Sequence, residues 1–163
     1  MKEELLKVQE NIRPYIHKTP VLTSSLADEL AACKCYFKCE NFQKMGAFKI
    51  RGATNAILSL DSKSRKNGVV THSSGNFAQA VALAAKQLKI KATIIMPNNA
   101  PSVKIEAVKN YGAEIILCEP TNEAREKTTE NFIKTNGGTF IHPSNDLNVI
   151  LGNGTAAMEL FKD

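Results

Sequence analysis

Lys49 stands at a position where an amine could act as a nucleophile. It follows the loop 43–47 and lies in the first turn of a helix that the pattern predicts from about residue 48 to 60. The positive end of a helix dipole lowers the cost of a neutral lysine, and the neutral amine is the form that attacks an aldehyde. Most lysines at such positions are simply solvated. Spacing alone therefore leaves two interpretations of Lys49, a surface residue or a nucleophile.

The loop Ser73-Ser74-Gly75-Asn76 is a second candidate site. It joins a predicted strand to an alanine-rich predicted helix. Backbone N–H groups at such a junction can bind a carboxylate or phosphate, and ligands collect at the carboxyl ends of strands in open parallel sheets. Ser74 or Asn76 could instead do no more than cap the helix. His72, a single histidine at a strand end, is more typical of a structural residue.

Two further patterns favour a structural explanation. The loop 142–146 follows a predicted strand, and the Gly-x-Gly segment 152–155 comes soon after it. A lone Gly-x-Gly is a weak signal that a turn between a strand and a helix explains. The chain also has four cysteines, at positions 33, 35, 39 and 118. The first three fall on one face of a predicted strand, and no second pair completes a zinc site, so we expect buried, reduced thiols and no metal.

The elements that would position these residues alternate from about residue 68 onward. Predicted strands at 69–72, 92–96, 114–118 and 139–141 are separated by predicted helices at 76–88, 101–111 and 122–135, and a last helix covers 155–161. Before residue 68 the pattern predicts helices at 2–12 and 25–32, strands near residue 21 and at 33–39, and a polar surface connection at 61–67. This order is typical of an α/β fold, a parallel sheet with helices on both faces.

Composition narrows the class of protein. The chain has 163 residues, enough for one core, with 43% hydrophobic and 23% charged residues. No stretch approaches the roughly 20 apolar residues that a membrane span needs. The net charge of +5 is scattered and aromatic residues are few, which argues against nucleic-acid binding. The first residues mix both charge signs, which is typical of a surface helix and not of a targeting peptide, so we expect a cytoplasmic protein.

Taken in order, the motifs resemble the fold-type II enzymes that depend on pyridoxal 5'-phosphate, in the branch that contains serine racemase, threonine dehydratase and hydroxyaspartate dehydratase. The most specific strings are Phe-Lys-Ile-Arg-Gly-Ala at 48–53 and Ser-Ser-Gly-Asn at 73–76, and the match continues to Gly-Asn-Gly-Thr at 152–155. The resemblance implies that residues 1–61 form the amino-terminal part of a large domain that carries the lysine. Residues 62–145 would form the small α/β domain, and residues 146–163 would return into the large domain.

The resemblance also implies roles around the cofactor. Lys49 would bind pyridoxal phosphate covalently and act as general base, and Phe48 would lie against the cofactor ring. Asn76 would hydrogen-bond the phenolic oxygen of the cofactor. Ser74 is similar to the serine that exchanges a proton on the face opposite the lysine in racemases. The implied reaction is loss of water from a hydroxy amino acid to give a keto acid and ammonia, or racemisation of an amino acid.

The substrate is the least defined part of the resemblance. Ser73, Gly75 and Asn76 would hold the carboxylate of a small hydroxy amino acid. The next residue is usually histidine in the family, whereas this chain has Phe77, which cannot donate a hydrogen bond to a substrate. Substrate preference is therefore open.

Family members are considerably longer than this chain. Their phosphate-binding tetraglycine loop would come soon after residue 163, so we expect the chain by itself to bind the cofactor weakly. The alternative to an enzyme is a truncated or split, non-catalytic lobe that needs a missing carboxyl-terminal half. A homodimer is the other association that the resemblance allows.

Overall fold

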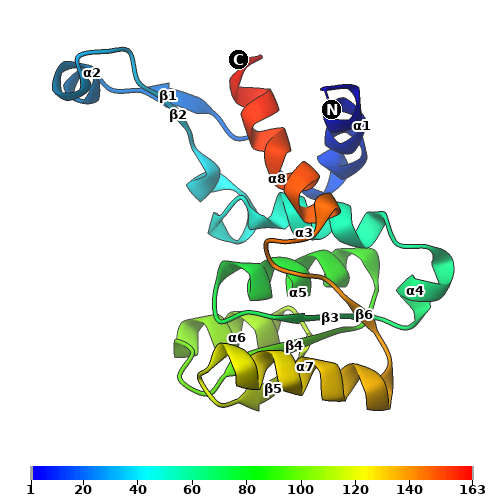
Figure 1. The fold of residues 1–163 in the computed structure, drawn as a ribbon. Helices are drawn as coiled ribbons and strands as arrows, with labels where there is room; N and C mark the ends of the chain where they lie inside the picture. The colour runs from blue at the N-terminus through cyan, green and yellow to red at the C-terminus, as the bar shows by residue number, and fades with distance from the viewer. Residues whose placement is uncertain (1, 163) are drawn as a thin grey trace.

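The computed structural model describes residues 2–162, and Figure 1 shows their arrangement. The helices are α1 (Lys2–Ile12), α2 (Ser25–Ala31), α3 (Lys49–Leu58), α4 (Ser62–Lys66), α5 (Asn76–Leu88), α6 (Ser102–Asn110), α7 (Asn122–Asn136) and α8 (Leu147–Leu160). Three single 3-10 turns are η1 (Arg13–Tyr15), η2 (Glu40–Phe42) and η3 (Lys44–Gly46). The strands are β1 (Val21–Thr23), β2 (Tyr36–Lys38), β3 (Val69–His72), β4 (Ala92–Pro97), β5 (Glu114–Cys118) and β6 (Thr139–Phe140). None of the helices among these residues is long and apolar enough to cross a membrane.

A four-stranded parallel sheet in the order β5-β4-β3-β6 organises the larger part of the chain. Every residue of β4 is buried, as expected of a central strand rich in β-branched residues. Helix α5 covers one face of the sheet and α7 covers the other (Figure 1). The predicted α/β fold, with a parallel sheet and helices on both faces, is confirmed. The strand order reverses direction between β3 and β6, which makes this pair the topological switch point.

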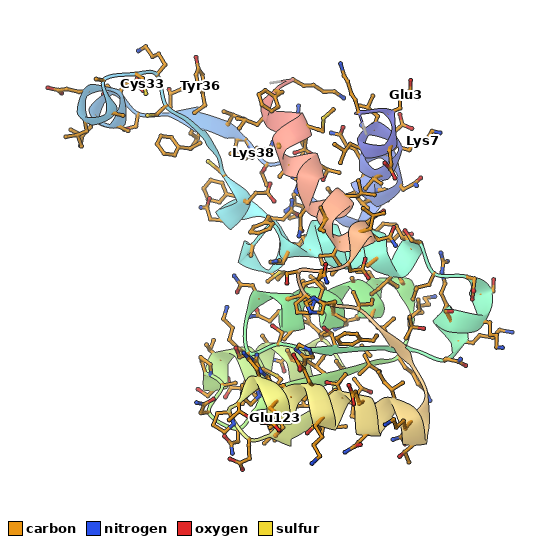
Figure 2. The ribbon with its side chains drawn as sticks, viewed as in Figure 1. Glu3, Lys7, Cys33, Tyr36, Lys38 and Glu123 are labelled. Carbon is orange, nitrogen blue, oxygen red and sulfur yellow. The ribbon has the colours of Figure 1, made fainter. Side chains whose placement is uncertain are left out.

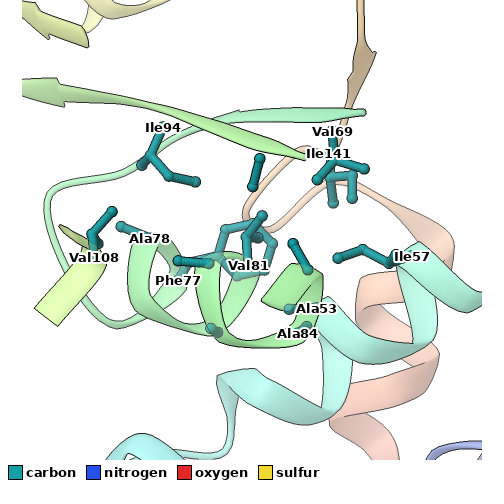
Figure 3. Packing of buried hydrophobic residues seen from close by; sticks show 14 of the residues in the cluster. Ala53, Ile57, Val69, Phe77, Ala78, Val81, Ala84, Ile94, Val108 and Ile141 are labelled. Atoms are coloured by element: carbon teal, nitrogen blue, oxygen red, sulfur yellow. The ribbon is translucent and has the colours of Figure 1, made fainter. Parts of the chain in front are cut away.

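The main hydrophobic core lies between this sheet and two helices, α3 and α5 (Figure 3). Alanines such as Ala78 and Ala84 are fully buried on α5, so α5 can approach both its neighbours closely. Ile57 of α3 and Ile94 of β4 fill the space on either side and are also fully buried. Packing of α3 against α5 fixes the helix that begins with Lys49 relative to the sheet.

Helix α8 begins at Leu147, eight residues earlier than the sequence pattern predicts, so the predicted start at 155 is wrong. Asp146 caps it, because the Asp146 Oδ1 accepts hydrogen bonds from the backbone N–H groups of residues 148 and 149. The Gly-x-Gly segment is inside this helix and is not a turn. A Cβ built on Gly152 would lie 2.5 Å from the carbonyl oxygen of Arg51 and 2.7 Å from the Cα of Gly52. Gly152 of α8 and Gly52 of α3 therefore let the backbones of these two helices touch.

Substitution Gly152→Ala is expected to lower the free energy of unfolding by about 1–3 kcal/mol, because the added methyl group forces the two helix backbones apart. The gain in helix propensity, about 1 kcal/mol, works in the opposite direction and is smaller than this strain. Gly154→Ala is the matched control on the same helix, since its Cβ would meet only a movable methyl group of Leu5 at 3.1 Å. Urea unfolding of both variants checks this; equal stabilities would contradict the close contact.

A second, two-stranded antiparallel sheet is formed by β1 and β2, which with α2 project from the body of the molecule (Figures 1 and 2). Strand β2 is shorter than the predicted strand 33–39, because the chain turns after α2. Ala32 has a left-handed backbone that ends α2, and Asp28 Oδ1 accepts a hydrogen bond from the backbone N–H of Cys35 at 2.7 Å. The prediction of buried thiols is therefore wrong for Cys33, which is exposed; Cys39 is buried.

The polar run 61–67 is also more ordered than the sequence predicts. It contains the short helix α4, whose first turn is capped by Asp61 through a 2.7 Å hydrogen bond from the backbone N–H of Ser64. This bond is the first cause of the lowered pKa of Asp61. The Asp-Ser-Lys-Ser pattern is a helix start signal that lies within an otherwise loop-like composition.

Candidate active site

The carboxyl ends of β3 and β6 bring two of the predicted site segments together. The loop 73–76 follows β3, the loop 142–145 follows β6, and these two strands are neighbours in the sheet. Lys49 reaches the same place from α3, because its Nζ donates a 3.3 Å hydrogen bond to the carbonyl oxygen of Pro143. Three segments that are far apart in the sequence therefore meet at the switch point, where ligands bind in sheets of this kind.

Aromatic rings surround the amine of Lys49. Its Nζ lies 5.3 Å from the centre of the Phe48 ring and 5.8 Å from that of Phe77. The Lys49 residue itself is half-buried, while Phe48 is 42% exposed and Phe77 is buried. Phe48 thus offers an open aromatic face beside the amine. Phe77, the residue that departs from the family pattern, forms part of the floor of the site.

The loop 73–76 is shaped by its own backbone and not by a side-chain cap. Gly75 is the N-cap of α5 and no side chain satisfies this helix start, so Ser74 and Asn76 do not act as caps. Ser73 Oγ instead accepts a 3.2 Å hydrogen bond from the N–H of Gly75. A Cβ on Gly75 would meet no atom within 4 Å, which marks open space next to the loop. This space and the uncapped N–H groups can accept an anion.

Three rings line the other side of the switch point. The ring of His72 lies 5.4 Å from that of Phe140 and 6.0 Å from that of His142. Burial, followed by the positive charge of Arg125, lowers the pKa of His72, which favours the neutral form of its ring. Its Nδ1 is buried and has no partner among residues 2–162. His142 Nδ1 accepts hydrogen bonds from the backbone N–H groups of residues 144 and 145, which gives the loop beside Lys49 its shape.

A buried charge network holds α3, and it has no counterpart among the predicted site residues. Arg51, which is fully buried, donates to both carboxylate oxygens of Glu40 at 2.8 Å and to those of Glu159 at 2.8 and 2.9 Å. Lys38 also contacts Glu159, at 2.9 Å. Burial opposes the charge of Arg51, but the two carboxylates outweigh it and raise the pKa of the guanidinium. The network ties the helix that begins with Lys49 to η2 and α8.

Several donors and surfaces at this site fit pyridoxal phosphate. The amine of Lys49 can react with an aldehyde, and Phe48 provides an aromatic face for a ring. Asn76 Oδ1 is occupied by Lys104 at 2.7 Å, while its Nδ2 donates to no residue within 2–162. No run of more than two glycines occurs in the chain. The residues present therefore fit the aldehyde and the phenolic oxygen of the cofactor. They do not include a glycine-rich loop for its phosphate.

Comparisons with known proteins find relatives over nearly the whole chain. The family model described as pyridoxal-phosphate dependent enzyme matches residues 12–163. The chain is 49% identical over 160 residues to serine racemase of Dictyostelium discoideum, covering 98% of this chain and 49% of that protein. It is 46% identical over 158 residues to β-hydroxyaspartate dehydratase of Paracoccus denitrificans, covering 97% of this chain and 50% of that protein.

The fold also matches solved structures of proteins with similar sequences. The structure of maize serine racemase matches with a TM-score of 0.95 and 48% sequence identity, covering 98% of this chain and 49% of that one. The chain spans about half the length of the curated relatives it matches.

Proposed function

Because the chain belongs to the family of pyridoxal-phosphate dependent enzymes, we propose that it supplies the lysine-bearing half of the active site of a hydroxy-amino-acid ammonia-lyase or amino-acid racemase. The observation that carries this proposal is the convergence at the switch point. Lys49 Nζ, the Phe48 ring and the uncapped loop 73–76 lie at the same edge of the sheet. The named relatives are a serine racemase and a hydroxyaspartate dehydratase, which makes a small hydroxy amino acid the proposed substrate.

Each residue has a defined task in this proposal. When bound, pyridoxal phosphate withdraws electrons and acidifies the α-hydrogen of an amino acid. Lys49 takes that proton as general base, with its amine held beside the carbonyl of Pro143. The loop residues Ser73, Gly75 and Asn76 bind the substrate carboxylate. Ser74 acts from the opposite face, where return of a proton inverts the α-carbon.

The same proposal covers the division of the chain. Residues 1–61 and 146–163 would belong to a large domain, with residues 62–145 as the small domain. We also propose a cytoplasmic location, the compartment in which exposed thiols such as Cys33 stay reduced.

The second candidate function is a lobe that needs a separate or continuing second half. Its support is a set of large apolar side chains on the projecting sheet, on η2 and in or just after α8 that are 47% to 87% exposed: Leu22, Tyr36, Phe37, Phe42, Ile150 and Phe161. A hollow of about 490 Å³ is lined by residues of α1, η1 and the end of α8. Large apolar side chains that are exposed together are typical of a face that another polypeptide covers.

A complementation assay distinguishes the two candidates. The chain is incubated with pyridoxal phosphate and L-serine, L-threonine or L-hydroxyaspartate, and keto acid, ammonia and the D-amino acid are measured. The assay is repeated after adding the carboxyl-terminal half of the Dictyostelium serine racemase. Turnover by the chain alone supports a self-sufficient enzyme, and turnover only in the mixture supports a lobe that needs a second half. Absence of turnover in both would contradict the proposed activity.

A further inference from the structure

Lys104 makes a contact that links the second layer of helices to the candidate site. It lies in the first turn of α6 and its Nζ donates a 2.7 Å hydrogen bond to Oδ1 of Asn76, the first residue of α5. A cation in a first turn is unfavourable with respect to the helix dipole, so this lysine gains nothing from its own helix. Its hydrogen bond to Asn76 is the one interaction recorded for its amine within residues 2–162.

The contact decides which way the carboxamide of Asn76 faces. A carboxamide has one oxygen that accepts and one nitrogen that donates, whereas a lysine ammonium only donates. Lys104 can therefore bind the oxygen alone, and the Nδ2 group must point to the other side. That Nδ2 has no partner within the described residues and is exposed together with the rest of Asn76. The positive charge also polarises the amide, which strengthens its N–H groups as donors.

We propose that Lys104 is a positioning residue that holds Asn76 with its Nδ2 donor directed into the site, ready for an acceptor oxygen next to an aldehyde. This inference rests on the proposed function, in which that oxygen is the phenolic oxygen of pyridoxal phosphate. Without Lys104 the carboxamide can turn over, and its oxygen would then face another oxygen. The lysine acts through Asn76 and touches neither cofactor nor substrate.

The first test needs no cofactor. The side-chain amide resonance of Asn76 is assigned by NMR in the wild-type chain and compared in Lys104→Met and Lys104→Arg. We expect a shift in Lys104→Met that Lys104→Arg largely reverses, because arginine restores a charged donor. Lys86→Met is the matched control, since Lys86 also joins α5 to α6, through a 3.2 Å bond to the carbonyl of Asn110, but at the far end of both helices. An unchanged Asn76 resonance in Lys104→Met would overturn the proposal.

The second test measures pyridoxal phosphate attached to Lys49, trapped by borohydride reduction and quantified by peptide mass spectrometry over a range of cofactor concentrations. Lys104→Met is expected to raise the half-saturating concentration about two- to tenfold, the range for one hydrogen bond. The same substitution in an Asn76→Ala background should have no further effect, because the two residues act as one unit. A purely structural role for Lys104 would persist in that background and would overturn the proposal.

The outcomes keep the two proposals apart. If pyridoxal phosphate does not attach to Lys49 in preference to other lysines of the wild-type chain, both the proposed function and this inference are contradicted. If pyridoxal phosphate attaches to Lys49, and Asn76→Ala raises the half-saturating cofactor concentration but Lys104→Met does not, only the positioning role of Lys104 is contradicted.

Discussion

Replacing Lys49 with alanine should abolish every activity of the proposed site, with a fall in turnover of at least about 10²–10⁴-fold, the contribution of a general base. The loss of covalent attachment adds to this effect, because the amine of Lys49 is the one that lies beside both the Phe48 ring and the carbonyl of Pro143. Turnover is measured in whichever form of the complementation assay is active. The absorption band of the bound cofactor, near the edge of the visible wavelength range, should disappear in Lys49→Ala.

The control for Lys49→Ala is Lys44→Ala in the turn just before α3. Lys44 is also half-buried and carries the same charge, but it is not among the residues that converge at the switch point. Lys44→Ala should keep both turnover and absorbance. The free energy of unfolding should change little in either variant, since Lys49 makes one hydrogen bond of 3.3 Å. Activity retained in Lys49→Ala would remove the basis of the proposed mechanism.

Replacing Arg51 with methionine should lower the free energy of unfolding by about 3–5 kcal/mol, the usual cost of removing one partner from a buried ion pair. The substitution leaves two carboxylates, Glu40 and Glu159, facing each other without their shared cation. Lys34→Met is the matched control, because Lys34 forms a salt bridge of 2.9 Å with Asp28 but is 78% exposed. Lys34→Met should lower the free energy of unfolding by less than about 1 kcal/mol. Comparable losses in the two variants would contradict the structural role of the network.

The acid sensitivity of the chain should change in the same variant. Burial raises the pKa of Glu159, but hydrogen bonds from Arg51 and Lys38 outweigh it and hold that pKa below the ordinary value of 4.5. The stability that this carboxylate contributes is therefore complete above pH 4.5 and is lost as the pH falls through its folded-state pKa. In Arg51→Met the loss should begin at a higher pH. Urea midpoints measured between pH 3 and pH 7 check this shift.

Much of the fold is predictable from the sequence because its signals are local. Strands such as β4 are apolar runs ended by proline, and α5 is an alanine-rich helix that follows a glycine. The position of Lys49 at the start of a helix is equally local, and its family motif lies in the same string. The resemblance adds the roles of Ser73, Ser74 and Gly75, which remain proposals.

The features that the sequence does not predict correctly depend on contacts between residues that are far apart in the chain. The sequence pattern places the start of α8 too late because Gly152 and Gly154 are typical of loops, whereas the close contact of Gly152 with α3 holds this segment in a helix. The signal that could have found it is Asp146 before the apolar Leu147, a helix cap. The Arg51 network joins residues 108 positions apart, so no local pattern reveals it. The bond between Lys104 and Asn76 likewise exists only once α5 and α6 pack together.

The most direct test of the central claim is the location of pyridoxal phosphate on the protein. The chain is equilibrated with the cofactor, reduced with borohydride and mapped by peptide mass spectrometry. We predict that the peptide containing Lys49 carries the added mass at lower cofactor concentration than any other lysine peptide. Modification spread evenly over the surface lysines, or concentrated on another lysine, would contradict the assignment of Lys49 as the cofactor lysine.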